Sequence, residues 1–285
     1  MFALLKRNIK IYFNNVPGVF MSLLGALISF FIYIGFLQQN LEDSWHYLPD
    51  IAKLLDLWMI AGIVSVAGIT TSFQTLGQMV KDKESRKADD LRLTELSQFK
   101  INLTYVLSAA LISFLMQIIT LIVMVTYFKI VDKIELPNNG YLLLLMFILL
   151  GSIAATLLNA LIVAFIHSST TFSRLSAIIG TLSGFAVATY LPYGALSKHI
   201  QTLVKCVPSS YEAASLRSLL LNQISHQKLS ASLRTEMANY LGIHFKIADH
   251  LLSRADNAWI LVEMIIALVL IIVIISFTSE RKRTN

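Results

Sequence analysis

The chain has 285 residues, of which 56% are hydrophobic and only 14% are charged, and its mean hydropathy is +0.68. Soluble domains usually carry about a quarter charged residues, so this composition excludes an ordinary soluble domain and predicts a membrane protein. The net charge of +6 does not indicate nucleic-acid binding, because no basic stretch alternates with aromatic residues on a polar face. The single cysteine, Cys206, excludes an intrachain disulfide.

The N-terminal stretch has the pattern of an amphipathic helix on the inner membrane surface. Its basic residues are Lys6, Arg7 and Lys10, and a plain basic flank that orients the first span is the alternative. Pro17 and Gly18 then turn the chain into that span, which we expect to act as an uncleaved insertion signal. The apolar residues at helical spacing are Phe2, Leu5, Ile9, Tyr12 and Phe13.

Six segments are apolar over roughly the 17–25 residues that a helix needs to cross a bilayer. The second turns polar near its end and the fifth is short and contains Gly180 and Gly184, features that suit helices packed inside a bundle. We therefore predict an all-α polytopic membrane protein, with a single domain over residues 1–285 and six transmembrane helices. The expected spans are 19–37, 57–80, 103–128, 141–166, 175–191 and 258–277.

Lysine and arginine residues in short loops predict the orientation, because they accumulate on the cytoplasmic side. With the N-terminus inside, the short outer loops hold only Lys53, Lys129 and Lys133. Both termini are then cytoplasmic, which requires an even number of spans. The basic residues of the inner segments are Lys6, Arg7, Lys10, Lys81, Lys83, Arg86, Lys87, Arg92, Lys100, Arg174, Arg281, Lys282 and Arg283.

The inner loop 81–100 is highly charged, with both signs mixed. A solvated inner loop would explain its basic residues by the positive-inside rule. That explanation leaves out the acidic residues, which have no effect on orientation. Leu91, Leu93, Leu96 and Phe99 recur at spacings compatible with a short amphipathic helix. We predict a helix that docks to a soluble partner.

The outer segment 192–257 is long but contains periodic apolar residues, which predict short helices separated by Pro208 and by the polar stretch Asn222–Lys228. We expect its first part to fold back onto or into the outer leaflet as re-entrant or short helices, where protein or water must cover any irregular backbone.

Motifs for catalysis are missing from the sequence. It has no phosphate-binding G-x-x-x-x-G-K-[ST], no H-E-x-x-H and no G-x-S-x-G, so we predict neither an enzyme nor a metal site. Glu263 is the one ionisable residue inside a strongly apolar span. Snorkelling or pairing with another helix is one interpretation, and a place on a substrate path is the other.

Four features in order make the chain resemble the membrane subunits of ABC-2 type exporters. They are a surface helix over Leu4–Asn14 before six spans, a charged stretch after the second span, a glycine-rich fifth span followed by a proline, and a P-x-x-Y-x-x-x-x-x-R-like region. The charged stretch is Lys83-Glu84-Ser85-Arg86-Lys87-Ala88-Asp89-Asp90-Leu91. The glycine-rich span contains Gly180-Thr181-Leu182-Ser183-Gly184-Phe185 and is followed by Leu191-Pro192. The last region consists of Pro208-Ser209-Ser210-Tyr211 and Arg217. The chain departs from the family at Ala88, where glycine is common, and at Thr94-Glu95, where Thr-Pro is common, which favours a longer coupling helix.

The resemblance implies a permease without an ATPase of its own. It implies two ABC ATPase subunits as partners, which carry the ATP and Mg, and a second permease copy in a homodimer or a related heterodimer. The implied ATPase-coupling residues are Lys83, Glu84, Arg86, Lys87, Asp89, Asp90 and Leu91. A path lined by spans one, two and five has the candidates Thr70, Thr71, Gln74, Gln78 and Glu263, of which those on span two could equally bond helices together. An outer lid has the candidates Pro192, Pro208, Tyr211 and Arg217.

The expected function is therefore ATP-driven export of a drug, peptide, toxin or lipid-like molecule across a bacterial plasma membrane. A polysaccharide or glycolipid exporter is the alternative within the family. A stand-alone secondary transporter would show internal repeats and paired intramembrane charges, and the sequence has neither. Besides the ATPase and the second permease, we expect contact with membrane lipids and none with nucleic acid.

Overall fold

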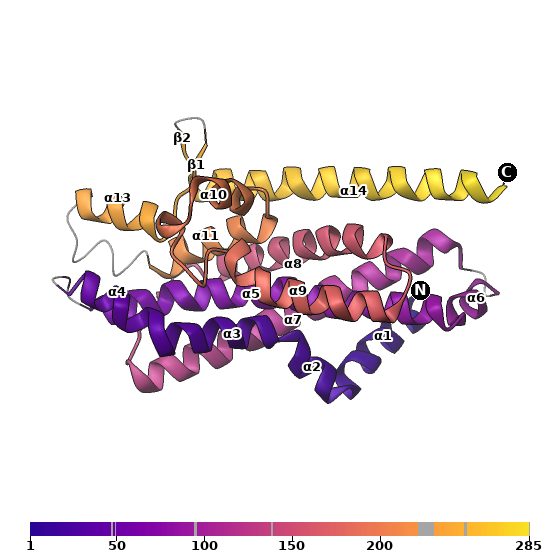
Figure 1. Cartoon of the computed structure of the whole chain (residues 1–285), viewed down its shortest axis with the longest axis horizontal. Helices are drawn as coiled ribbons and strands as arrows, with labels where there is room; N and C mark the ends of the chain where they lie inside the picture. The colour runs from indigo at the N-terminus through magenta and orange to yellow at the C-terminus, as the bar shows by residue number, and fades with distance from the viewer. Residues whose placement is uncertain are drawn as a thin grey trace.

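A computed structural model of the chain describes residues 1–46, 48, 50–93, 96–137, 139–221, 231–247 and 250–284. These residues form a bundle of long helices with a cap of short elements at one end (Figure 1). Within the described residues, five helices are long and apolar enough to cross a membrane: Leu24–Ser44, Ile51–Glu84, Gln98–Val131, Tyr141–Ala164 and Arg254–Ile275. The prediction of an all-α polytopic membrane protein is confirmed at this level.

The N-terminal region forms α1 (Phe2–Asn14), as predicted, followed by α2 (Val16–Ser22). Val19 therefore lies in α2, and the candidate span begins later, at Leu24. The reason is local: the Tyr12 and Ser22 hydroxyls lie 2.7 Å apart, so α2 folds back against α1. The span is continuous through α3 (Leu24–Ile32), a π-helical turn (Tyr33–Leu37) and α4 (Gln38–Ser44).

The helix α5 (Ile51–Glu84) is the centre of the bundle. It packs against α3, α7 (Gln98–Val131), α8 (Tyr141–Ala164) and α9 (Ser169–Ala186). Because α5 is surrounded by other helices, its polar side chains can form hydrogen bonds only within the protein. Near the N-terminus of α5 the Tyr33 hydroxyl donates to the Asp56 carboxylate over 2.7 Å, which fixes the π-helical turn to α5.

The expected fifth span, 175–191, corresponds to α9, which is not one of the five candidates within the described residues. The helix begins earlier, because the Ser168 hydroxyl accepts a hydrogen bond from the Thr171 amide as an N-cap. It also ends earlier, at Ala186, before Ala188 takes the left-handed conformation. Arg174 and several serines and threonines lower its hydropathy.

The outer segment contains the short helices expected from its periodicity: a 3-10 turn at Tyr193–Ala195, α10 (Lys198–Lys205), α11 (Pro208–Leu220) and α13 (Ala231–Tyr240). A two-stranded hairpin of β1 (Lys246–Ile247) and β2 (His250–Leu251) was not predicted. The polar stretch Asn222–Lys228 falls outside the described residues. The last helix, α14 (Arg254–Thr284), packs on α8 and α11.

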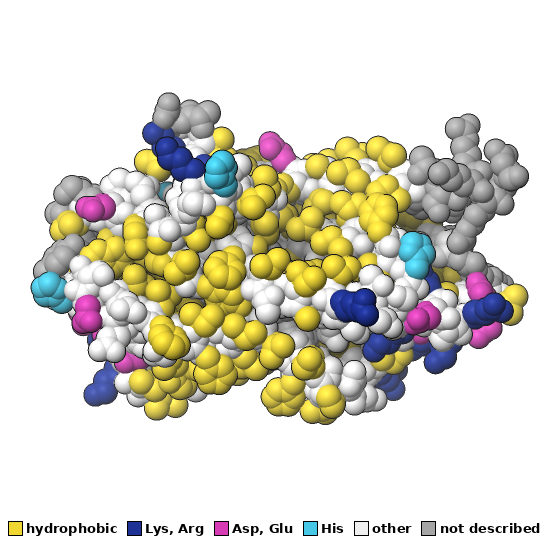
Figure 2. Space-filling model, viewed as in Figure 1, with side chains coloured by type: hydrophobic (Ala, Val, Ile, Leu, Met, Phe, Trp, Pro, Cys, Tyr) yellow, Lys and Arg dark blue, Asp and Glu magenta, His cyan; other side chains and the backbone are white. Residues whose placement is uncertain are grey.

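The molecule has two chemically distinct ends. Both termini and α6 (Lys87–Arg92) lie toward one end of the long axis, while α10, α13 and the hairpin lie toward the other (Figure 1). Hydrophobic side chains cover much of the surface between them, and charged side chains gather toward the ends (Figure 2). This distribution is typical of a protein whose middle is surrounded by lipid.

Candidate functional site

The predicted coupling segment connects α5 to α7, two of the helices that form the bundle. Glu84 ends α5, Arg86 adopts a left-handed conformation with φ of 58°, and α6 follows at once. The side chains of Lys83, Glu84, Arg86, Lys87, Asp89 and Asp90 are all exposed. A charged, solvent-facing helix between two structural helices is a geometry suited to contact with another protein.

Only part of the apolar edge expected in this segment faces the protein. Leu91 and Leu96 pack against a cluster formed by Leu4, Ile101 and Tyr105, whereas Leu93 is 88% exposed. The helix α6 has 6 residues and ends at Arg92, and a coupling helix longer than is usual in the family stays a prediction. Thr94 and Glu95 lie outside the described residues.

Glu84 has a contact that its place in the motif did not predict. Its carboxylate accepts hydrogen bonds from both the amide and the hydroxyl of Ser169, the first residue of α9. The end of α5 is therefore tied to the start of α9, next to the coupling segment. A carboxylate at a helix N-terminus is also favoured by the helix dipole.

Asp82, which the sequence did not single out, is the most highly bonded side chain near this segment. It is buried, and its two oxygens accept from the Arg7 guanidinium at 2.8 and 3.1 Å, from the Tyr105 hydroxyl at 2.6 Å and from the Gln78 amide at 2.8 Å. The hydrogen bonds with Asp82 raise the pKa of Arg7, which stays charged. Asp82 thus joins α1, α5 and α7 directly beside the coupling segment. We name Asp82, Arg7, Tyr105 and Gln78 the Asp82 cluster.

Two of the four polar residues predicted on span two line one cavity. Thr70 and Gln74 lie in a cavity of about 190 Å³ bounded by α2, α3, α5 and α9. The Gln74 carbonyl accepts a hydrogen bond of 3.0 Å from the Ser176 hydroxyl of α9. These residues are thus both cavity lining and a link between two helices.

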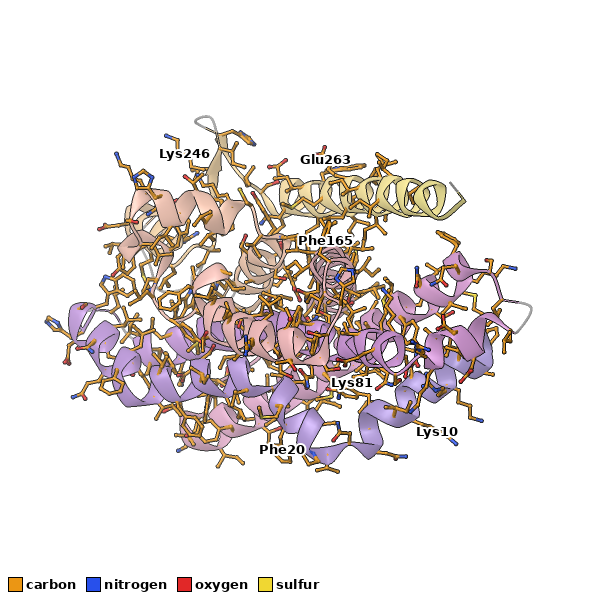
Figure 3. The ribbon with its side chains drawn as sticks, turned by 45° about the vertical axis from the view of Figure 1, so that its right-hand side comes forward. Lys10, Phe20, Lys81, Phe165, Lys246 and Glu263 are labelled. Carbon is orange, nitrogen blue, oxygen red and sulfur yellow. The ribbon has the colours of Figure 1, made fainter. Side chains whose placement is uncertain are left out.

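The other predicted path residues lie elsewhere. Thr71 is fully buried on the side of α5 that faces Tyr12 of α1, and Gln78 belongs to the Asp82 cluster. Glu263 is exposed on the face of α14 that points away from the bundle (Figure 3). Thr71 and Glu263 therefore do not line this cavity, whereas Gln78 lines a second pocket together with Gln74 and Lys81.

The wall of the cavity depends on a glycine. Phe172 of α9 stacks on Phe73 with ring centroids 4.8 Å apart, and a methyl group added at Gly77 would lie 2.5 Å from the Phe172 ring. We expect Gly77→Ala to displace this ring and to destabilise the protein by about 1–3 kcal/mol. Thermal unfolding in detergent measures this, with Gly180→Ala as the control because a methyl group there meets nothing within 4 Å. Equal melting temperatures for the two variants would contradict the prediction.

At the opposite end, Arg217 of α11 is fully buried and holds three elements together. Its guanidinium lies 3.0 Å from the Ala188 carbonyl, 3.2 Å from the Val187 carbonyl and 3.5 Å from the Gly242 carbonyl. The first two carbonyls belong to the end of α9, where a cation is favoured. The guanidinium carbon also lies 4.9 Å from the centroid of the Trp58 ring, a cation–π contact.

The remaining predicted lid residues lie in α11 or directly before the 3-10 turn. Pro208 is in the first turn of α11, the Tyr211 hydroxyl donates to the Lys205 carbonyl over 2.7 Å, and Pro192 is buried before the 3-10 turn. Glu212, which sequence reasoning missed, is fully buried with its carboxyl group against Gly151 of α8 and Ser65 of α5. Glu212 and Arg217 are the two charged residues of α11, five positions apart among small and apolar residues, and this pairing was the signal that could have found Glu212.

Comparison with protein families gives one match. The family model described as ABC-2 family transporter protein matches residues 55–279, from near the start of α5 into the last part of α14, and so includes both ends of the bundle. The chain belongs to the ABC-2 transporter family. Comparison with curated proteins found no match, and neither did comparison with solved structures.

Membership of the ABC-2 family bears on the kind of protein that the charged segment could contact. The permeases of this family are membrane transport components without an ATPase of their own, and the family implies an ABC ATPase as partner. The resemblance expected from the sequence is thus confirmed at the level of the family. The roles of individual residues in this ABC-2 permease follow below as proposals.

Proposed function

We propose that this ABC-2 protein is the permease subunit of an ATP-driven exporter, with ATP hydrolysed on separate subunits. The observation that carries the proposal is the exposed, mixed-charge helix α6 between α5 and α7, anchored by Leu91 and the Asp82 cluster. Charges of both signs on a docking surface determine orientation and partner choice more than affinity. The coupling residues are then those around α6. A movement of α6 would reach α9 through the contact between Glu84 and Ser169.

The path of the chain supports six crossings with α9 as the fifth. Its 18 residues span about 27 Å at 1.5 Å per residue, close to the roughly 30 Å thickness of the hydrocarbon layer. The helix packs along α5 and α3, so its polar side chains find protein partners. Six crossings place both termini and α6 in the cytoplasm of a bacterial cell, α1 on the inner surface, and α11 as a re-entrant helix on the outer side.

The cavity between α3, α5 and α9 opens at the surface of the chain. A second permease copy, identical or related, would complete its walls and form the export path. Two ATPase subunits that close on ATP would push α6, and the Asp82 cluster and the Glu84–Ser169 contact would transmit the movement to α1, α7 and α9. The transported molecule is then a drug, peptide, toxin or lipid-like compound.

The test is affinity purification of the tagged permease from its native membrane in a mild detergent. We expect a soluble subunit that hydrolyses ATP to copurify. The triple variant Arg86→Glu, Lys87→Glu, Asp90→Lys should lose at least nine-tenths of this ATPase, because it reverses charges that the structure exposes.

A matched control reverses two exposed charges at the opposite end, Lys133→Glu with Glu135→Lys. It should retain the ATPase. A permease that transports alone, without any copurified ATPase, would overturn the proposal, and so would an ATPase that the triple variant retains in full.

A further inference from the structure

The cavity between α3, α5 and α9 has an apolar body and one charged end. Its apolar side chains come from Met21 and Leu24 on one side, Phe73 on α5, and Phe172 and Ile179 on α9. At the inner end it reaches Lys81, the only charged residue that lines it among the described residues. From Thr70 to Lys81 the cavity extends over about 16 Å along α5, at 1.5 Å per residue.

The ammonium group of Lys81 is available to a ligand. Within the part of the chain that the structure describes, Lys81 takes part in no ion pair and its side chain is exposed. The two acids beside it in the sequence are engaged elsewhere, Asp82 by Arg7 and Glu84 by Ser169. No carboxylate therefore neutralises the charge at this end of the cavity.

Its position relative to the membrane, which rests on the proposed function, agrees with this chemistry. Lys81 lies where α5 leaves the apolar layer, and the labelled side chain is seen between the α1–α2 corner and α9 in Figure 3. A lysine at this depth extends its ammonium to the headgroup layer. Lys6 and Lys10 on the exposed face of α1 add positive potential at the same end.

We propose that this cavity binds an amphiphile with an anionic head, whose phosphate, sulfate or carboxylate pairs with Lys81. The apolar chain lies along Leu24, Phe73 and Phe172 toward the middle of the bilayer. The Gln74 amide nitrogen, which also lines the cavity, donates a hydrogen bond below the head, while the Ser173 and Ser176 hydroxyls donate to the Ser169 carbonyl and the Gln74 side-chain oxygen. The substrate class of the permease is then an anionic amphiphile, and neutral or cationic compounds are selected against.

The experiment measures binding to the purified permease alone, in nanodiscs of phosphatidylcholine, so its outcome does not depend on an ATPase partner. The probe is 11-(dansylamino)undecanoic acid, followed by fluorescence. Dodecyl phosphate and dodecyltrimethylammonium, which share one chain length and carry opposite charges, serve as competitors. We expect dodecyl phosphate to displace the probe at a concentration at least tenfold lower.

Lys81→Gln should weaken probe binding about tenfold and abolish the preference between the competitors, whereas Lys133→Gln, an exposed lysine at the opposite end, should change neither. Gly180→Leu fills space that no atom occupies within 4 Å of its position and should weaken both competitors equally. Displacement by phosphatidylglycerol in the nanodisc would assign the site to a membrane lipid, and displacement by dodecyl phosphate alone to a mobile substrate. Equal binding of the probe to wild type and Lys81→Gln would overturn the proposal.

Discussion

Arg217→Met is expected to destabilise the protein by about 3–5 kcal/mol, because breaking a buried charged interaction from one side leaves its partners uncompensated. The partners are the carbonyls of Val187, Ala188 and Gly242, three residues that are themselves buried. Methionine has about the right length but no donor, and it also loses the contact with the Trp58 ring. The measurement is thermal unfolding in detergent, where we expect a melting temperature lower by on the order of 10 °C.

Two further variants distinguish the loss of the Arg217 hydrogen bonds from a nonspecific effect of replacing an arginine. Arg174→Met removes an exposed arginine from α9 and should leave the melting temperature within a degree or two. Arg217→Lys keeps the charge but lacks the planar fork that reaches several carbonyls, so it should fall between wild type and Arg217→Met. A melting temperature of Arg217→Met equal to that of wild type would show that the carbonyls are satisfied by other means.

Asp82→Ala is expected to release α1 from the bundle. The substitution removes the acceptor of Arg7, Tyr105 and Gln78 at once, and the loss of one side of such a buried pair costs about 3–5 kcal/mol. The 33% exposure of Arg7 reduces this cost, because the freed guanidinium reaches water. Hydrogen exchange of residues 2–14 measures the release directly, and transport should fall with it.

A double-mutant cycle with Arg7→Met tests whether the pair itself is responsible. Arg7→Met alone should cost less, because Asp82 keeps the Tyr105 and Gln78 hydrogen bonds, and the double variant should cost less than the sum of the single variants. Lys10→Met on the exposed face of α1 is the control. Unchanged exchange of residues 2–14 in Asp82→Ala would mean that the apolar contacts of Leu4 and Tyr12 hold α1 on their own.

Under the proposed function α6 lies at the end of the bundle that contacts the ATPase, and Arg217 lies at the opposite end, so these two predictions have different consequences. Loss of Arg217 affects the packing of α9, α11 and the turn after α13, far along the sequence from α6. Loss of Asp82 affects the segment through which an ATPase would act. We therefore expect Arg217→Lys to keep ATPase copurification, whereas Asp82→Ala should weaken it together with transport.

The sequence by itself determined the class of protein, most of the spans and the charged loop. Hydropathy sums over consecutive residues and the helix keeps its own backbone hydrogen bonds in lipid, so Tyr141–Ala164 and Arg254–Ile275 followed from composition alone. The ordered motifs were enough to predict the ABC-2 family, which the match over residues 55–279 confirms. Polar residues in the end of α5 predicted contacts inside the bundle but not with which helix.

Only the tertiary structure decided the partners. Arg7 and Asp82 are 75 residues apart. The Trp58 indole donates to the Leu241 carbonyl over 2.7 Å across 183 residues, and no local pattern relates either pair. Two neighbouring path candidates show the same limit of the sequence. Thr70 faces a cavity and Thr71 is buried against α1, because consecutive residues point about 100° apart around a helix of 3.6 residues per turn. Which face meets α9 depends on how the helices pack, and this packing leaves Lys81 at the charged end of an apolar cavity.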